Sequence, residues 1–244
     1  MKKLMLARSS SLGLAVAALG ACLATASPAN ASPVDYVANL TPLNNSGVYA
    51  TVNLVLDGNL LTVTEHATGL EPGKLHVQHI HGLVGADAPN THVATSANDT
   101  NHDGYVDLAE GQTSYGPILL NLSSPPGGAI SAFPTAPNGT IDFSQTYDLS
   151  NQSDFGTSFT KADLLPLTDR EIVIHGMTVG KGYVYSVPGG DPLDGTVHYV
   201  ATLPVADGMI RLASTAVPEP GSFALLLTGV LGCAAAARRR RSAG

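Results

Sequence analysis

The chain has 244 residues, of which 44% are hydrophobic and 13% are charged, and this composition excludes an intrinsically disordered chain. Its 26 Gly, 16 Pro and lack of Trp favour many turns and a β-rich fold. Residues 32–217 hold five basic and 18 acidic residues, a net charge of −13, which argues against nucleic-acid binding through a basic face. Both cysteines lie outside this segment, so it can form no internal disulfide.

The N-terminal segment 1–31 is predicted to be a secretion signal peptide. Three basic residues within the first eight precede an apolar run at 12–23, and the segment ends in Ala-Asn-Ala, a small-residue site at which signal peptidase would cleave after Ala31. Two alternatives remain open. Residues 19–22 resemble a bacterial lipobox, which would leave a lipidated Cys22, and the segment could instead be a buried helix.

The segment 32–216 is predicted to be one all-β domain, an antiparallel, Greek-key-like β-sandwich. Short β-rich runs alternate with Gly, Pro and Asn, and Asp57-Gly58 is a typical hairpin turn. Residues 161–165 are predicted to form a single helical turn that ends at Pro166. The expected strands are 48–56, 60–64, 75–81, 118–122, 140–147, 171–175, 183–187, 197–203 and 209–212.

Histidines are concentrated in the predicted strand 75–81. His79 and His81 would share one face of this strand, and His76 would face the other way. Two imidazoles need a third ligand, which His175 at the end of the apolar strand 171–175 could supply. The pattern predicts a copper or zinc site. The alternative is that the three imidazoles are structural and bond to the backbone or to one another.

The segment 99–110 fits the calcium-loop pattern D-x-[DN]-x-[DN]-G-x5-E at every place. Gly104 permits the sharp turn, and Glu110 closes the site with two oxygens. The predicted calcium ligands are Asp99, Asn101, Asp103, the Tyr105 carbonyl, Asp107 through a water, and Glu110.

The flanks of this loop lack the periodicity of an EF-hand. Residues 90–98 show no helical pattern, and Gly111 is expected to limit any following helix to about one turn. We therefore expect an EF-hand-like calcium loop inserted between strands, where the ion would stabilise the fold. The alternative is a polar turn without metal.

From Tyr36 to about Leu212 the chain resembles a CHRD (chordin-type) domain. The residues that carry this likeness are 38–40, 56–58, 69–70, 79–82 and 201–204. Some exported bacterial members have a calcium-like loop followed by Tyr-Gly-Pro-Ile, as at 115–118 here. The resemblance implies an exported surface protein, with extracellular polysaccharide as a candidate partner.

A second, more distant resemblance is to copper–zinc superoxide dismutase. That family has H-x-x-H-x-H, as at 76–81, a later V-V-H, as at 173–175, and a closing A-C-G-V-I strand, as at 206–210. It implies copper ligation by His79, His81 and His175. Asp207 replaces the family's cysteine, Pro204 replaces its substrate-guiding arginine, and the other zinc ligands lack counterparts at the family's spacing, although His92 or His102 could approach the site.

The C-terminal segment 217–244 resembles the PEP-CTERM sorting signal of Gram-negative bacteria. Pro218, Glu219 and Pro220 precede an apolar stretch at 221–237, and four arginines follow it. The stretch is long enough for a short transmembrane helix with its arginine end in the cytoplasm. The resemblance implies recognition by exosortase, a membrane protease, and removal of the tail. A permanent anchor is the alternative.

Together these features predict an exported, calcium-stabilised module in the cell envelope or extracellular matrix of a Gram-negative bacterium. A binding or structural role fits better than an enzyme, because the sequence contains neither a nucleophile elbow nor a nucleotide-binding glycine loop. The rival functions are a superoxide-dismutase-like copper redox protein and a periplasmic copper carrier.

Overall fold

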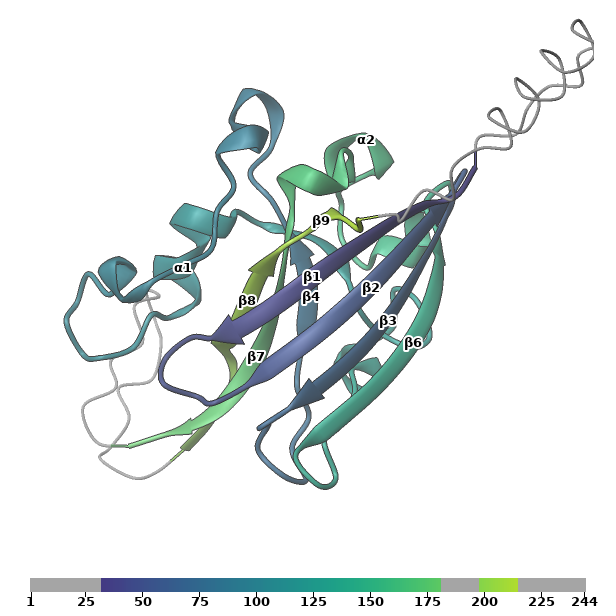
Figure 1. Cartoon of the computed structure of the whole chain (residues 1–244). Helices are drawn as coiled ribbons and strands as arrows, with labels where there is room; N and C mark the ends of the chain where they lie inside the picture. The colour runs from purple at the N-terminus through teal and green to yellow at the C-terminus, as the bar shows by residue number, and fades with distance from the viewer. Residues whose placement is uncertain (1–31, 181–197, 215–244) are drawn as a thin grey trace, which may run out of the picture. The chain divides into compact units, whose positions relative to one another are not determined.

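A computed structural model of the chain describes residues 32–180 and 198–214 (Figure 1). The predicted signal peptide, the strand 183–187, the sorting signal and the processing residues Ala31, Pro218, Glu219 and Pro220 lie outside the described residues.

The described part of the chain is mostly β-structure. Its strands are β1 (Val34–Pro42), β2 (Tyr49–Asp57), β3 (Leu60–Thr68), β4 (Gln78–His81), β5 (Ile118–Asn121), β6 (Thr140–Asp148), β7 (Glu171–Val179), β8 (His198–Met209) and β9 (Arg211–Leu212). They form one antiparallel sheet in the order β5-β4-β7-β8-β1-β2-β3-β6, with β9 beside β1. The pairs β3–β6, β4–β7 and β1–β8 join strands that are not consecutive, and Greek-key topologies contain crossovers of this kind.

The sheet curls into a half-barrel, and β1 is the strand at which it turns. β1 pairs with β2 along most of its length, from Val34 to Leu40, but it meets β8 only through Thr41 and Pro42. The all-β antiparallel prediction is confirmed. The fold is also sandwich-like, as expected, but its two halves form one continuous curled sheet, because β1 pairs with both β2 and β8.

Alternating side chains place the core inside this curl. Along β2 and β3 every second residue is buried, including Val52, Leu54, Leu61 and Val63. β4 and β7 contribute Ile80, Ile172 and Ile174 to the same cluster. The other face of β4 and β7 carries polar side chains instead, and it is buried as well.

Short helical segments lie in the connections between strands. The α-helices are α1 (Leu108–Tyr115) and α2 (Lys161–Leu164). The 3-10 segments are η1 (Gly85–Asn90), η2 (Ser96–Asn98), η3 (Ile130–Ala132), η4 (Gln152–Phe155) and η5 (Leu167–Asp169). α2 agrees with the predicted helical turn.

α1 is longer than the single turn that Gly111 was expected to allow. The helix continues to Tyr115, because an Asp107/Glu110 capping box starts it and Gly111 lies directly under the Tyr115 ring. A Cβ at position 111 would collide with that ring. Gly111 therefore serves the packing of α1, and Gly116, at a φ of 77°, ends the helix.

Candidate metal centre

Two neighbouring strands bring three histidines together on one face of the sheet. His79 and His81 lie on β4 and His175 lies on β7. The strands pair with His79 opposite Val173 and His81 opposite Glu171. One potential ligand atom from each histidine lies within 4.8 Å of the other two. The structure thus assembles the three residues that the sequence pattern singled out.

In the part of the chain that the structure describes, each of these rings has one buried nitrogen without a hydrogen-bond partner: Nδ1 of His79 and Nε2 of His81 and His175. The Nδ1 atoms of His81 and His175 lie 3.0 Å and 2.9 Å from the carbonyl oxygens of Gly116 and Thr202. A carbonyl oxygen only accepts, so Nδ1 carries the proton in both rings and Nε2 keeps a free lone pair. Metal-binding histidines are held in this way.

The surroundings keep all three imidazoles neutral. Burial, together with the neighbouring His175, lowers the pKa of His81 to about 3, although its bond to Gly116 acts in the opposite direction. Burial also lowers the pKa of His175 to about 4 and that of His79 well below its usual range. At neutral pH each ring therefore offers a lone pair, which is the form that binds a metal.

Aromatic rings pack against two of the three histidines. The Tyr115 ring, at the end of α1, lies 4.7 Å from the His81 ring between centroids, and the Phe133 ring lies 5.3 Å from that of His79. His79 is 6% exposed, compared with 0% for His81 and 1% for His175. Access from solvent is therefore greatest beside His79.

A buried carboxylate lies on the same face. Glu171 is directly opposite His81 and is 0% exposed. Within residues 32–180 and 198–214, neither of its carboxylate oxygens has a hydrogen-bond partner. Burial, followed by the nearby Asp207 carboxylate, raises its pKa well above the usual range. The guanidinium of the adjacent Arg170 donates instead to backbone carbonyls, those of Leu83, Asp163, Leu164 and Asp169.

The other histidines serve different surroundings. His76 Nδ1 lies 3.0 Å from the backbone oxygen of His175, so this ring supports the strand that carries a candidate ligand. His66 pairs with Asp142 at 2.6 Å on the exposed face of β3 and β6, and His198 begins β8. His92 and His102 are exposed, and neither belongs to the histidine cluster that the described residues form.

The predicted calcium loop follows η2 in the connection from β4 to β5, and its last three residues form the start of α1. Asp99 Oδ2 accepts the Gly104 N–H at 2.9 Å, and Asp99 Oδ1 accepts the Asp103 N–H at 3.2 Å. Gly104 has a φ of 90°, so the sharp turn occurs at the expected glycine. A 3-10 segment precedes the loop in place of an EF-hand helix, as the absence of helical periodicity predicted.

The glutamate that closes the loop, Glu110, accepts hydrogen bonds from the backbone of the same segment. Glu110 Oε1 accepts the N–H groups of Thr100 and Asn101 at 2.9 and 3.1 Å, and Oε2 accepts the Asp107 N–H at 3.0 Å. The carboxylate therefore ties the start of the loop to the first turn of α1. Of the predicted calcium ligands, Glu110 and Asp107 are buried and Asn101 is exposed.

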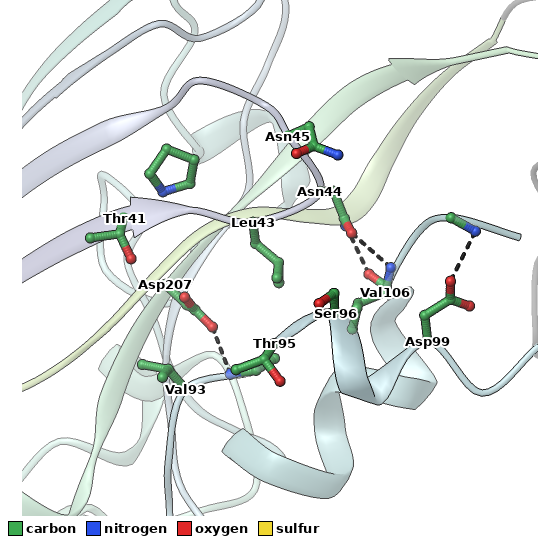
Figure 2. A pocket seen from close by; sticks show the side chains of 13 residues that line it. Thr41, Leu43, Asn44, Asn45, Val93, Thr95, Ser96, Asp99, Val106 and Asp207 are labelled. Carbon is green, nitrogen blue, oxygen red and sulfur yellow. Dashed lines mark hydrogen bonds between the residues drawn. The ribbon is translucent and has the colours of Figure 1, made fainter. Parts of the chain in front are cut away.

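A cavity of about 470 Å³ lies where this loop meets the β1–β2 turn. Figure 2 shows the side chains that line it. On one side Asp207 Oδ2 accepts the Ala94 N–H at 2.8 Å. On the other side Asn44 accepts the Val106 N–H at 2.7 Å and donates to the Val106 carbonyl at 2.9 Å. These bonds fasten the long connection between β4 and β5 to the sheet and to the β1–β2 turn.

Glu171 and Tyr115 lie beside the histidines, although no sequence pattern singled them out. Glu171 begins an apolar strand, and only the register that places it opposite His81 reveals its position. The signal for Tyr115 was the Tyr-Gly-Pro-Ile segment, which ends α1 beside His81.

Comparison with known families identifies one region. Residues 216–241 match the PEP-CTERM protein-sorting motif, which confirms the predicted sorting signal at the C-terminus. No curated protein matches the chain. Within the described ranges, no helix combines the length and apolar character that a membrane crossing requires.

Proposed function

We propose that this exported, exosortase-sorted protein binds one copper or zinc ion through His79, His81 and His175. The sorting motif marks the chain as a protein for export and envelope sorting by exosortase. The metal site is supported by one observation above all. Three buried imidazole nitrogens, unpartnered among the described residues, belong to a cluster whose ligand atoms lie within 4.8 Å of one another.

An unpartnered buried polar atom costs about 1–3 kcal/mol, so three of them at one place favour a ligand over a merely structural role. The alternative role required the rings to bond to backbone or to one another. Only the Nδ1 atoms of His81 and His175 make such bonds, and these leave Nε2 available. Imidazole suits both copper and zinc, and either ion has room for a further ligand beside three histidines.

Binding is a better proposal than catalysis. A dismutase needs an open metal position and a positive guide for its anionic substrate. Here the three histidines are almost fully buried, Pro204 occupies the guiding position, and residues 32–217 carry a net charge of −13. We infer a metal-binding module of the envelope or matrix. A copper carrier or a copper redox protein would use the same site. We also propose that the domain is related to CHRD domains and associates with extracellular polysaccharide.

Calcium is the second candidate ligand, at Asp99, Asn101, Asp103, Tyr105, Asp107 and Glu110. The complete sequence motif and the turn at Gly104 support it. Extracellular modules bind calcium with dissociation constants of about 10⁻⁴–10⁻³ M, so the ion would stabilise the loop at the concentrations found outside cells.

Metal content measured by mass spectrometry tests the histidine site. The exported protein is loaded with copper, zinc and calcium and then desalted. We expect close to one copper or zinc per chain, and we expect both His79→Ala and His175→Ala to lose it. His92→Ala, an exposed histidine outside the cluster, is the matched control and should retain the metal. Retention of copper and zinc by either cluster variant would refute the shared site.

A further inference from the structure

Five buried side-chain polar atoms in residues 32–180 and 198–214 lack a hydrogen-bond partner, and all five belong to β4 and β7. Three are the imidazole nitrogens of His79, His81 and His175, and the other two are the carboxylate oxygens of Glu171. The register places Glu171 opposite His81. Side chains directly opposite each other in an antiparallel pair lie on the same face of the sheet. The five atoms without a partner therefore lie on one face of β4 and β7.

Glu171 is not a fourth member of the ligand cluster. The group in the described residues whose ligand atoms all lie within 4.8 Å of one another contains the three histidines alone. Glu171 therefore lies beside the ligand group, on the same face of the sheet, without being one of its members. In the metal-free protein burial favours the protonated form of Glu171. A cation bound beside it would favour the carboxylate, with the proton released to solvent, and the carboxylate could accept a hydrogen bond from a water that completes the coordination.

We propose that Glu171 sets the charge specificity of the metal site, so that the site favours a divalent over a monovalent ion. This inference rests on the proposed metal site. Three neutral imidazoles leave the whole charge of a bound ion uncompensated in a site that is almost dry. The attraction between an ion and a nearby carboxylate is proportional to the charge of the ion. Glu171 consequently favours Zn²⁺ or Cu²⁺ over Cu⁺, whereas the imidazoles bind both kinds of ion.

The test compares Zn²⁺ and Cu⁺ affinities, measured by competition with a chromogenic zinc chelator and, under reducing conditions, with bicinchoninate. Glu171→Gln keeps the shape of the side chain and removes its charge. We expect the Zn²⁺ affinity to fall about 10–100-fold, the range for changes just outside a coordination shell. The Cu⁺ affinity should change much less. Glu171→Asp, which keeps the carboxylate, should recover part of the preference for Zn²⁺.

Glu65→Gln is the matched control, because Glu65 is equally buried in the same sheet but lies in the interior cluster beside Gln78. It should leave the ratio of the two affinities unchanged. If Glu171→Gln does not fold, Glu171→Thr, which suits a strand and also removes the charge, takes its place.

If Glu171→Gln lowered the Zn²⁺ and Cu⁺ affinities equally, or lowered neither, the proposed role of Glu171 would be overturned. Failure of the wild-type protein to bind either ion would instead overturn the proposed metal site. The two failures are therefore distinguishable.

Discussion

The histidine centre on β4 and β7 and the acidic loop 99–110 both gather metal-binding side chains, but their backbones hold them differently. The histidines lie on paired strands, and their ring positions follow from the register of the sheet. The loop has no such frame, so its carboxylates hold its own backbone through the N–H groups of Asp103, Gly104 and Tyr105. The histidine cluster has ligand atoms without a hydrogen-bond partner among the described residues. In the acidic loop, carboxylate oxygens already accept hydrogen bonds from the loop backbone.

This difference concerns the energy of the metal-free protein. On the strands, desolvation keeps the imidazoles neutral and leaves lone pairs unsatisfied, so the sheet carries a cost that a metal would remove. In the loop, the carboxylates already accept hydrogen bonds, so a metal would have to compete with them. We therefore expect tight transition-metal binding at the strands and weaker calcium binding at the loop.

The largest effect tests whether burial on strands neutralises ionisable groups. Glu65 on β3 is 2% exposed, and burial raises its pKa to about 8 from 4.5. With its nitrogen turned toward Glu65, the Gln78 amide lies 3.0 and 3.2 Å from the two carboxylate oxygens. Because this pKa is raised on folding, the contribution of neutral Glu65 to the free energy of unfolding is fully present below pH 4.5 and is lost as the pH rises toward 8.

Glu65→Gln should therefore flatten the pH profile of the unfolding free energy. The slope that it removes is about 1.4 kcal/mol per pH unit in this window, and the difference at pH 8 is on the order of 4 kcal/mol. Urea unfolding at pH 4.5, 6 and 8 measures it. Asp87→Asn, an exposed acid in η1, is the control and should follow the wild type. Parallel profiles for Glu65→Gln and the wild type would mean that the strands do not impose neutrality.

The second effect separates the structural role of the loop from its proposed calcium role. Glu110→Gln loses the charge and the bidentate carboxylate. Its single oxygen can accept either the Thr100 and Asn101 N–H groups or the Asp107 N–H of the capping box, but not both, because the amide nitrogen only donates. Glu110→Ala loses all of these bonds. Without calcium, we expect a loss of about 1–2 kcal/mol for the Ala variant and a smaller loss for the Gln variant.

With millimolar calcium, the wild type should show a higher melting temperature that EGTA reverses, and both Glu110 variants should lose this response. Calorimetry with and without EGTA is the measurement. A calcium response that survives in Glu110→Gln would remove Glu110 from the site, and a wild type that does not respond to EGTA would contradict the calcium proposal.

The sequence predicted the strand-borne features better than the connections. Alternation of apolar residues located β2, β3 and β6, and the spacing of His79 and His81 was enough to place them on one face. β1 was missed because Asp35, Asn39 and Pro42 interrupt its pattern. The two halves of the sheet are joined by only two residue pairs between β1 and β8, and no local sequence pattern can indicate such a pairing.

The candidate site shows the same division. The histidines could be chosen from sequence because each lies on a recognisable strand, and their convergence required only that the strands be neighbours. Glu171 could not be chosen, because its partnerless state depends on Arg170 donating to backbone carbonyls instead. The metal roles themselves remain predictions for both sites.

The smallest effect concerns the attachment of the loop to the sheet. Asn44 bonds both backbone groups of Val106 and also donates to the Pro204 carbonyl at 2.9 Å. Its φ of 57° lies in the left-handed region, as does that of its exposed neighbour Asn45 at 54°. Alanine at either position therefore pays a similar backbone cost of about 1 kcal/mol, and the difference between the two variants reports the side-chain bonds of Asn44.

We expect Asn44→Ala to be less stable than Asn45→Ala by about 1–2 kcal/mol, because three partly buried hydrogen bonds are lost in one variant alone. Hydrogen exchange should show faster opening of residues 99–110 in Asn44→Ala, while β4 and β7 remain protected. If β4 and β7 exchange as fast as the loop, then the histidine centre depends on the loop for its rigidity. The two regions would then not be held independently, one by its strands and the other by its own hydrogen bonds. Equal stability of the two alanine variants would mean that contacts other than Asn44 fasten the loop to the sheet.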